Sequence, residues 1–212
     1  MWATPNLSGT GGTASPQSAV SSLLSGPGTN PVLGATGAGY DLWAGVVRAQ
    51  ELAASSASNY DTIHHALFMV TPCSSNLSVY PSISRSSDAF CSGGAPYGGR
   101  IRLNMTPAQI AALSVPFYHK ALLLAASVYG AYMGDNNNTG LNFQTEADPM
   151  YTAAGTPNPL VAWAIKNGVP YNGTSYQIDI SGDVPVSSWQ WLLPPSQSIS
   201  DTIPQVFYGD GI

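Results

Sequence analysis

A stretch of apolar residues flanked by helix signals constrains the fold of this chain more than any other feature. Residues 116–129 would place alanine, leucine and valine on nearly every face of a helix, with Pro116 at the start and Gly130 directly after the end. A helix without a polar face is stable only when it is buried on all sides. The pattern therefore predicts a central helix that lies across a sheet.

The other expected elements are short, and strands do not alternate one for one with helices. Arg100 and Arg102 alternate with Ile101 and Leu103, and this period of two predicts a half-buried strand at residues 100–105. We expect an α+β fold, mainly an antiparallel β-sandwich of jelly-roll type, with three or four helices packed on one side. Similar patterns predict further strands at residues 63–70, 78–83, 131–133, 141–146, 176–180 and 189–193, and further helices at 40–55, 106–113 and 159–167.

The length of 212 residues and the 44 % of apolar residues favour a single domain with a sizeable core. Residues 1–39 are rich in glycine and are expected to form a loop-rich N-terminal arm. No apolar run approaches the roughly 18 residues that a membrane span requires. We therefore expect one domain over residues 1–212 and no membrane span.

Charged residues are scarce. Only 6 Lys and Arg and 11 Asp and Glu are present, or 8 % of the chain, against about a quarter in an ordinary globular protein. The net charge of −5 and the few cations argue against nucleic acid as a partner. Few carboxylates also mean little self-repulsion when they are protonated. We interpret the composition as that of a secreted, acid-stable extracellular protein.

Cys73 and Cys91 are the only cysteines, and they enclose a polar, serine-rich segment. In an oxidising compartment such a pair forms a disulfide, whereas the alternative is two buried free thiols. The extracellular interpretation favours the disulfide.

Signatures of metal and cofactor sites are absent from the sequence. There is no Walker loop and no Rossmann glycine fingerprint, so no cofactor is expected. His64 and His65 stand side by side, and in a strand their side chains would point to opposite faces. We therefore expect one exposed and one buried histidine and no metal site.

Three carboxylates gather around one expected hairpin: Asp135, Glu146 and Asp148. Paired carboxylates serve as acid and base, or as acid and nucleophile, in glycoside cleavage. The alternative is turn chemistry, because Asp135 begins an asparagine-rich loop and Asp148 precedes a proline. Glu146, at the end of a strand, is the strongest of the three catalytic candidates.

Two further pairs are candidates for substrate binding. Arg100 and Arg102 share the polar face of their strand and could hold an acidic sugar, or else a carboxylate of the protein. Trp189 and Trp191 share one face of another strand, on which a sugar ring or core neighbours could stack.

Residues 34–148 carry several motifs. Together they are a moderately specific signature, and each one alone is a weak signature. These are GATGAGYDLWAGVVRAQEL at 34–52, IHHAL at 63–67, GRIRL at 99–103, the helix ending in Tyr129 and Gly130, and NFQTEAD at 142–148. The stretch resembles a family of uncharacterised secreted proteins from actinobacteria and other soil bacteria. The family pattern reads Ile-Asp-His-Ala-Leu, Arg-Phe-Arg-Leu-Asp, Tyr-Gly and Glu-Asp-Pro.

The resemblance implies secretion and one domain, and it names no reaction. His64 replaces the aspartate of the family pattern, and Ala147 separates its acidic pair. Family members have a longer N-terminal region, so the resemblance implies that this chain could lack part of that unit or pair with a second chain that supplies it. The matching positions are His65, Arg100, Arg102, Tyr129, Gly130, Glu146 and Asp148.

Three functional hypotheses follow. The first is a secreted carbohydrate-active enzyme, a polysaccharide hydrolase or lyase, with Glu146 as acid/base or nucleophile and Asp148 or Asp135 as its partner. His65 and Arg102 would orient the polysaccharide or cell-surface glycan. The second is a non-catalytic extracellular binding module that uses its aromatic faces. The third is a self-assembling structural protein of a sheath, coat or filament.

Overall fold

The computed structural model describes residues 36–41, 43–85, 91–136, 141–146, 151, 155–173, 176 and 178–192. Almost all of the expected N-terminal arm at 1–39 lies outside these residues, as does the catalytic candidate Asp148.

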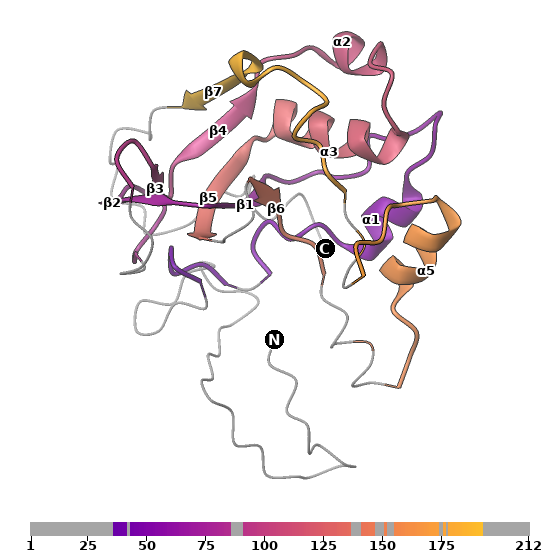
Figure 1. Ribbon diagram of the computed structural model, residues 1–212, viewed down its shortest axis with the longest axis horizontal. Helices are drawn as coiled ribbons and strands as arrows, with labels where there is room; N and C mark the ends of the chain where they lie inside the picture. The colour runs from indigo at the N-terminus through magenta and orange to yellow at the C-terminus, as the bar shows by residue number, and fades with distance from the viewer. Residues whose placement is uncertain are drawn as a thin grey trace.

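A five-stranded sheet forms the centre of the molecule (Figure 1), with the strand order β6-β1-β5-β4-β7. β1 and β5 are parallel, and the other neighbouring strands are antiparallel. A second, two-stranded parallel sheet pairs β2 with β3. The strands are β1 Leu67–Thr71, β2 Ser74–Ser78, β3 Ala95–Tyr97, β4 Arg100–Leu103, β5 Ala131–Asn136, β6 Asn142–Phe143 and β7 Trp189–Leu192.

The expected α+β class is confirmed, but the expected antiparallel sandwich is wrong. The described residues form one mixed sheet that curls into a half-barrel, with a small second sheet beside it. Leu67, Phe68 and Met69 are buried one after another, as in a parallel strand that is covered on both faces. This continuous burial makes β1 an interior strand of one sheet, whereas the strand of a sandwich would alternate buried with exposed residues.

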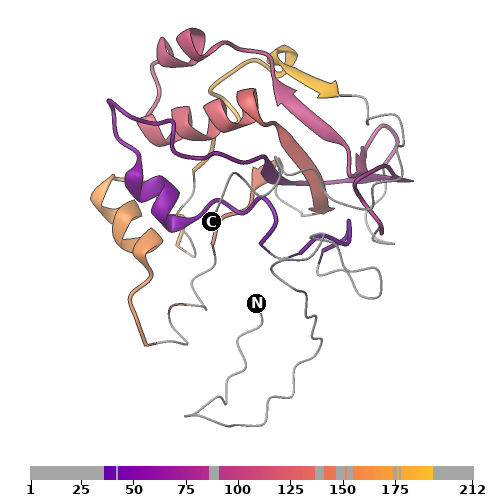
Figure 2. The ribbon, with the colours of Figure 1, turned by 180° about the vertical axis from the view of Figure 1, so that it is seen from behind.

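Four helices belong to the described residues: α1 Ala49–Ala54, α2 Pro107–Ala111, α3 Phe117–Val128 and α5 Pro159–Lys166. α3 is the expected central helix, since eight of its twelve residues are buried. It packs against β4, while α1 and α5 lie side by side at one end of the molecule (Figures 1 and 2). The central position of α3 confirms the prediction made from its apolar faces.

Local signals fix the ends of three helices as predicted. The Thr106 hydroxyl accepts the Gln109 N–H at the start of α2, and Asn158 Oδ1 accepts the Leu160 N–H at 2.8 Å at the start of α5. Gly130 follows α3 with φ +80, the left-handed conformation that ends a helix.

The helix expected at 40–55 is shorter than predicted, because only Ala49–Ala54 is helical. Gly45 has φ +66, and a Cβ there would lie 2.6 Å from the Phe68 nitrogen. The Gly45 carbonyl accepts the Phe68 N–H at 2.8 Å, and Val47 forms a parallel bridge with Thr145. The apolar residues before α1 therefore form a turn at 43–45 and a bridge at Val47 beside the sheet, although their spacing resembles that of a helix.

One expected strand is displaced along the chain, and another is not formed by the described residues. Residues 79–82 form a turn in which the Ser82 N–H bonds the Val79 carbonyl, and the strand lies earlier, at Ser74–Ser78. In the stretch 176–180, Tyr176 forms only an isolated bridge with Tyr171. The Asp179 side chain accepts the Ser181 N–H at 2.9 Å, the local bonding of a turn, which competes with strand pairing.

The Cys73–Cys91 disulfide is confirmed, with the two Cα atoms 5.7 Å apart. Each bonded cysteine lies before one strand of the small sheet, Cys73 before β2 and Cys91 before β3. The Cys91 N–H also donates to the Ser74 carbonyl at 2.9 Å.

Candidate functional site

The curl of the main sheet creates a pocket of about 510 Å³ on its inner face. Both edge strands contribute aromatic side chains to its wall, Phe143 from β6 and Trp189 and Trp191 from β7. Helix α5 adds Trp163. The volume falls within the range of small-molecule sites, which are mostly apolar with a few polar groups.

The aromatic wall follows from the alternation of side chains along β4 and β7. Ile101 pairs with Trp191, and Leu103 pairs with Trp189. Directly paired residues share one face of a sheet, so the two tryptophans lie on the inner face with Ile101. Trp191 remains 55 % exposed and can still receive a ligand. The predicted common face of the two tryptophans is thus part of the pocket wall.

Residues within 178–184, together with Tyr176, line another side of the pocket and add polar groups to it. Asp179 and Ser181 line the pocket together with Tyr176. Hydrogen bonds from the Ser181 side chain and backbone hold the pKa of Asp179 below its usual range, and nearby His119 acts in the same direction. Asp179 therefore presents an ionised carboxylate at neutral pH.

A histidine–carboxylate pair joins this segment to α3. His119 Nδ1 lies 2.7 Å from Asp183 Oδ2, and both side chains are largely buried. Ser181 and Val184, which lie on either side of Asp183 in the sequence, both line the pocket. The pair therefore fixes the pocket wall to the first turn of the central helix.

Glu146 and Asp135 lie outside the pocket lining. Glu146 Oε2 accepts the Ala49 N–H at 2.8 Å and the Tyr151 hydroxyl at 3.1 Å, so this carboxylate fixes the start of α1. Asp135 Oδ2 accepts the Gly37 N–H at 3.2 Å and joins β5 to the segment before α1. Burial and the nearby Glu146 carboxylate both raise the pKa of Tyr151.

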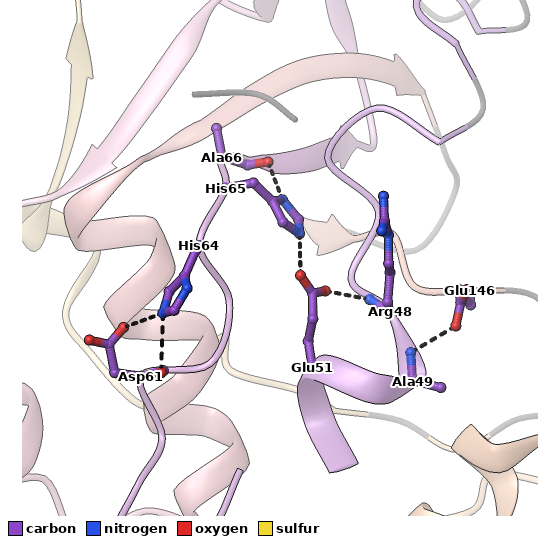
Figure 3. Close-up of polar contacts among 8 residues, drawn as sticks. All are labelled: Arg48, Ala49, Glu51, Asp61, His64, His65, Ala66 and Glu146. Atoms are coloured by element: carbon purple, nitrogen blue, oxygen red, sulfur yellow. Dashed lines mark hydrogen bonds and ion pairs between the residues drawn. The ribbon is translucent and has the colours of Figure 1, made fainter. Parts of the chain in front are cut away.

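His65 is buried, whereas His64 is exposed, as the alternation predicted. His65 Nε2 lies 3.0 Å from Glu51 Oε1, and its Nδ1–H donates to the Ala66 carbonyl at 2.9 Å (Figure 3). Glu51 Oε2 in turn accepts the Arg48 N–H at 2.7 Å. Figure 3 also shows Glu146 bonded to Ala49 in the first turn of α1, so His65 and Glu146 both hold this helix in place.

Arg100 and Arg102 share one face of β4, as predicted, and it is the face opposite Ile101. Arg102 Nε donates to the Ser127 carbonyl at 2.6 Å, and Arg100 donates to the Tyr129 carbonyl. Cations at these carbonyls complement the C-terminal end of the α3 dipole. Neither arginine lines the pocket.

Of the predicted site residues that the structure describes, Trp189 and Trp191 alone line the pocket. Four further lining residues were not predicted from the sequence, and they come from three separate segments: Phe143, Trp163, and Tyr176 with Asp179. The scarcity of carboxylates could have singled out Asp179, because its chain neighbours Ile178 and Ile180 are apolar.

Comparison of the chain with protein-family models, curated proteins and solved structures finds no match. Among the described residues no group of three or more His, Cys, Asp or Glu could hold a metal ion. No described helix is long and apolar enough to cross a membrane.

Proposed function

We propose that this chain is an extracellular carbohydrate-binding module whose pocket receives a sugar ring of a polysaccharide or cell-surface glycan. The observation that carries the proposal is the tryptophan pair on the inner face of β7, in the wall of a cavity of about 510 Å³. Sugar rings stack on aromatic faces through their apolar C–H groups. Asn142, Asp179 and Ser181 line the same pocket and supply polar groups for sugar hydroxyls.

Two observations support an extracellular location of the protein. The Cys73–Cys91 disulfide is of the kind that persists in oxidising compartments. The scarcity of charge fits a surface solvated by neutral hydroxyls and amides.

The hydrolase or lyase hypothesis remains open beside binding, and it depends on Glu146. That carboxylate already accepts two hydrogen bonds from the protein and lies outside the pocket lining, so the geometry supports binding better than catalysis. The self-assembly hypothesis finds its strongest support in the exposed β7 residue Trp191, which binding of a ligand would also explain.

The test is a screen of polysaccharides and oligosaccharides, with affinity measured by calorimetry and cleavage measured as released reducing sugar. For any sugar that binds, Trp191→Ala should weaken the affinity about tenfold, because a stacking face is lost. Leu77→Ala is the control, since Leu77 is exposed on β2 outside the pocket lining. Equal affinities of the two variants for the same sugar would place binding elsewhere and reject the proposal.

A further inference from the structure

The charge of the pocket points to a particular class of sugar. Asp179 is the only charged residue among the described residues that line it. All six Lys and Arg of the chain belong to the described residues, and none of them lines the pocket. An acidic sugar would therefore meet a carboxylate and no cation, which disfavours uronate-rich polymers.

The carboxylate of Asp179 has capacity left for a ligand. An ionised carboxylate offers about four acceptor positions. The Ser181 backbone N–H occupies one of these at 2.9 Å, and the Ser181 side chain bonds the same carboxylate. Asp179 is also exposed, so a cationic group on a ligand could reach it from the pocket mouth.

The aromatic wall also favours a ligand with a positive charge. A cation over the face of tryptophan or tyrosine is attracted by the ring quadrupole, and the attraction grows where water is displaced. Trp191, Trp189 and Tyr176 line the pocket that Asp179 borders. A protonated amine on a sugar ring could thus contact an aromatic face and a carboxylate in one bound position.

Among the described residues, no cationic side chain forms an ion pair with Asp179. The nearby His119 has a carboxylate partner of its own, since its Nδ1 lies 2.7 Å from Asp183 Oδ2. Neither of them lines the pocket. The Asp179 carboxylate is thus available to a cationic group of a ligand.

We propose that the pocket selects amino sugars with free, protonated amines over the same sugars in their neutral, N-acetylated form. This inference rests on the proposed function, since it names the class of sugar that the carbohydrate site takes. The amine is expected at Asp179 and the ring on the tryptophan wall.

The experiment compares chitosan and chitin oligomers of equal length by calorimetry with the full chain in mildly acidic buffer. The two ligands share the ring and the linkage, and they differ in charge at the amine. We expect the chitosan oligomer to bind at least about fivefold more tightly. Cello-oligosaccharide serves as the neutral reference and oligogalacturonate as the acidic one.

Two variants with the same change in charge distinguish binding in the pocket from non-specific attraction to the acidic protein surface. Asp179→Asn should abolish the preference for the free amine, so that this variant binds the chitosan and chitin oligomers with similar affinity. Asp61→Asn, at an exposed carboxylate outside the pocket lining, should preserve the preference. A loss that is equal in both variants would indicate non-specific attraction to an acidic protein and would overturn the inference.

The outcomes also distinguish this inference from the proposed function. Equal binding of chitosan and chitin oligomers, or tighter binding of oligogalacturonate, overturns the preference for amines and leaves a carbohydrate-binding pocket. Binding of none of the four ligands, together with a negative polysaccharide screen, overturns both.

Discussion

Phe143 and Trp189 face each other across the open side of the main sheet, with ring centroids 6.3 Å apart and ring planes tilted by 52°. Phe143 belongs to β6 and Trp189 to β7, which are the two opposite edges of the five-stranded sheet. The contact therefore joins the two edge strands of the half-barrel, β6 and β7, through side chains instead of backbone hydrogen bonds. It also forms part of the pocket wall, so the curvature of the sheet and the shape of the site depend on the same pair.

This contact should appear as an energetic coupling. In a double-mutant cycle of Phe143→Leu and Trp189→Leu, we expect a coupling of about 0.5–1.5 kcal/mol in the free energy of unfolding, as for other aromatic pairs. Urea unfolding of the four proteins measures it. Additive effects of the two substitutions would show that the edges of the half-barrel are held in place by other contacts.

The central helix should tolerate truncation poorly. Leu123 is fully buried in α3, and Leu123→Ala should lower the free energy of unfolding by roughly 2–5 kcal/mol, because it leaves a cavity between helix and sheet. Val128→Ala is the matched control, since Val128 is 48 % exposed at the end of the same helix. Similar losses in the two variants, measured by chemical unfolding, would contradict the central position of α3.

The disulfide should stabilise the small sheet and its surroundings. Replacing Cys73 and Cys91 together by serine should lower the free energy of unfolding by about 3 kcal/mol, since a cross-link with a sequence separation of 18 restricts the unfolded chain. Urea unfolding of the oxidised protein and of the double variant measures this loss. Mass spectrometry after alkylation without reduction should find no labelled thiol, and two labelled thiols would contradict the bond.

How far the sequence predicts this fold depends on whether a feature is encoded locally. Thr106, Asn158 and Gly130 act within one turn of their own helix, and the sequence predicted the elements that they delimit. The parallel pairing of β1 with β5 joins residues that are more than sixty positions apart. No local pattern encodes that pairing, so the sequence predicted an antiparallel sandwich where β1 belongs to a mixed sheet.

The candidate site was harder to predict for the same reason. Trp189 and Trp191 were found because they share one strand, and a period of two reveals their common face. Phe143, Trp163 and Asp179 meet them only in the folded chain. Glu146 and Arg102 stood out as rare charges, but a chain with few charges also uses them to bind its own backbone, here at the start of α1 and the end of α3.

Stability should change little in acid. Asp179 has a pKa below the ordinary value of 3.8, so the stability it contributes is fully present above that value and is lost as the pH falls through its lower, folded-state pKa. The chain has only 11 carboxylates to protonate, which limits the charge imbalance. We expect the melting temperature to fall by only a few degrees from about pH 7 to about pH 4, and to fall further only below that. A collapse of the melting temperature within that range, measured by calorimetry, would refute the acid-stable interpretation.

Glu146 offers the sharpest test of the enzyme hypothesis. Glu146→Gln keeps a carbonyl oxygen that can accept the Ala49 N–H and the Tyr151 hydroxyl, so α1 should remain in place. If a polysaccharide is cleaved, a catalytic acid/base or nucleophile at this position should lose at least about a hundredfold in rate while the melting temperature is preserved. A residue that only positions α1 gives the opposite pattern, because Glu146→Ala should then lower stability and Glu146→Gln should leave any cleavage rate unchanged. The two substitutions therefore separate catalysis from helix positioning for whichever polysaccharide is cleaved, and unchanged cleavage by Glu146→Gln would leave the tryptophan wall as the remaining basis for function.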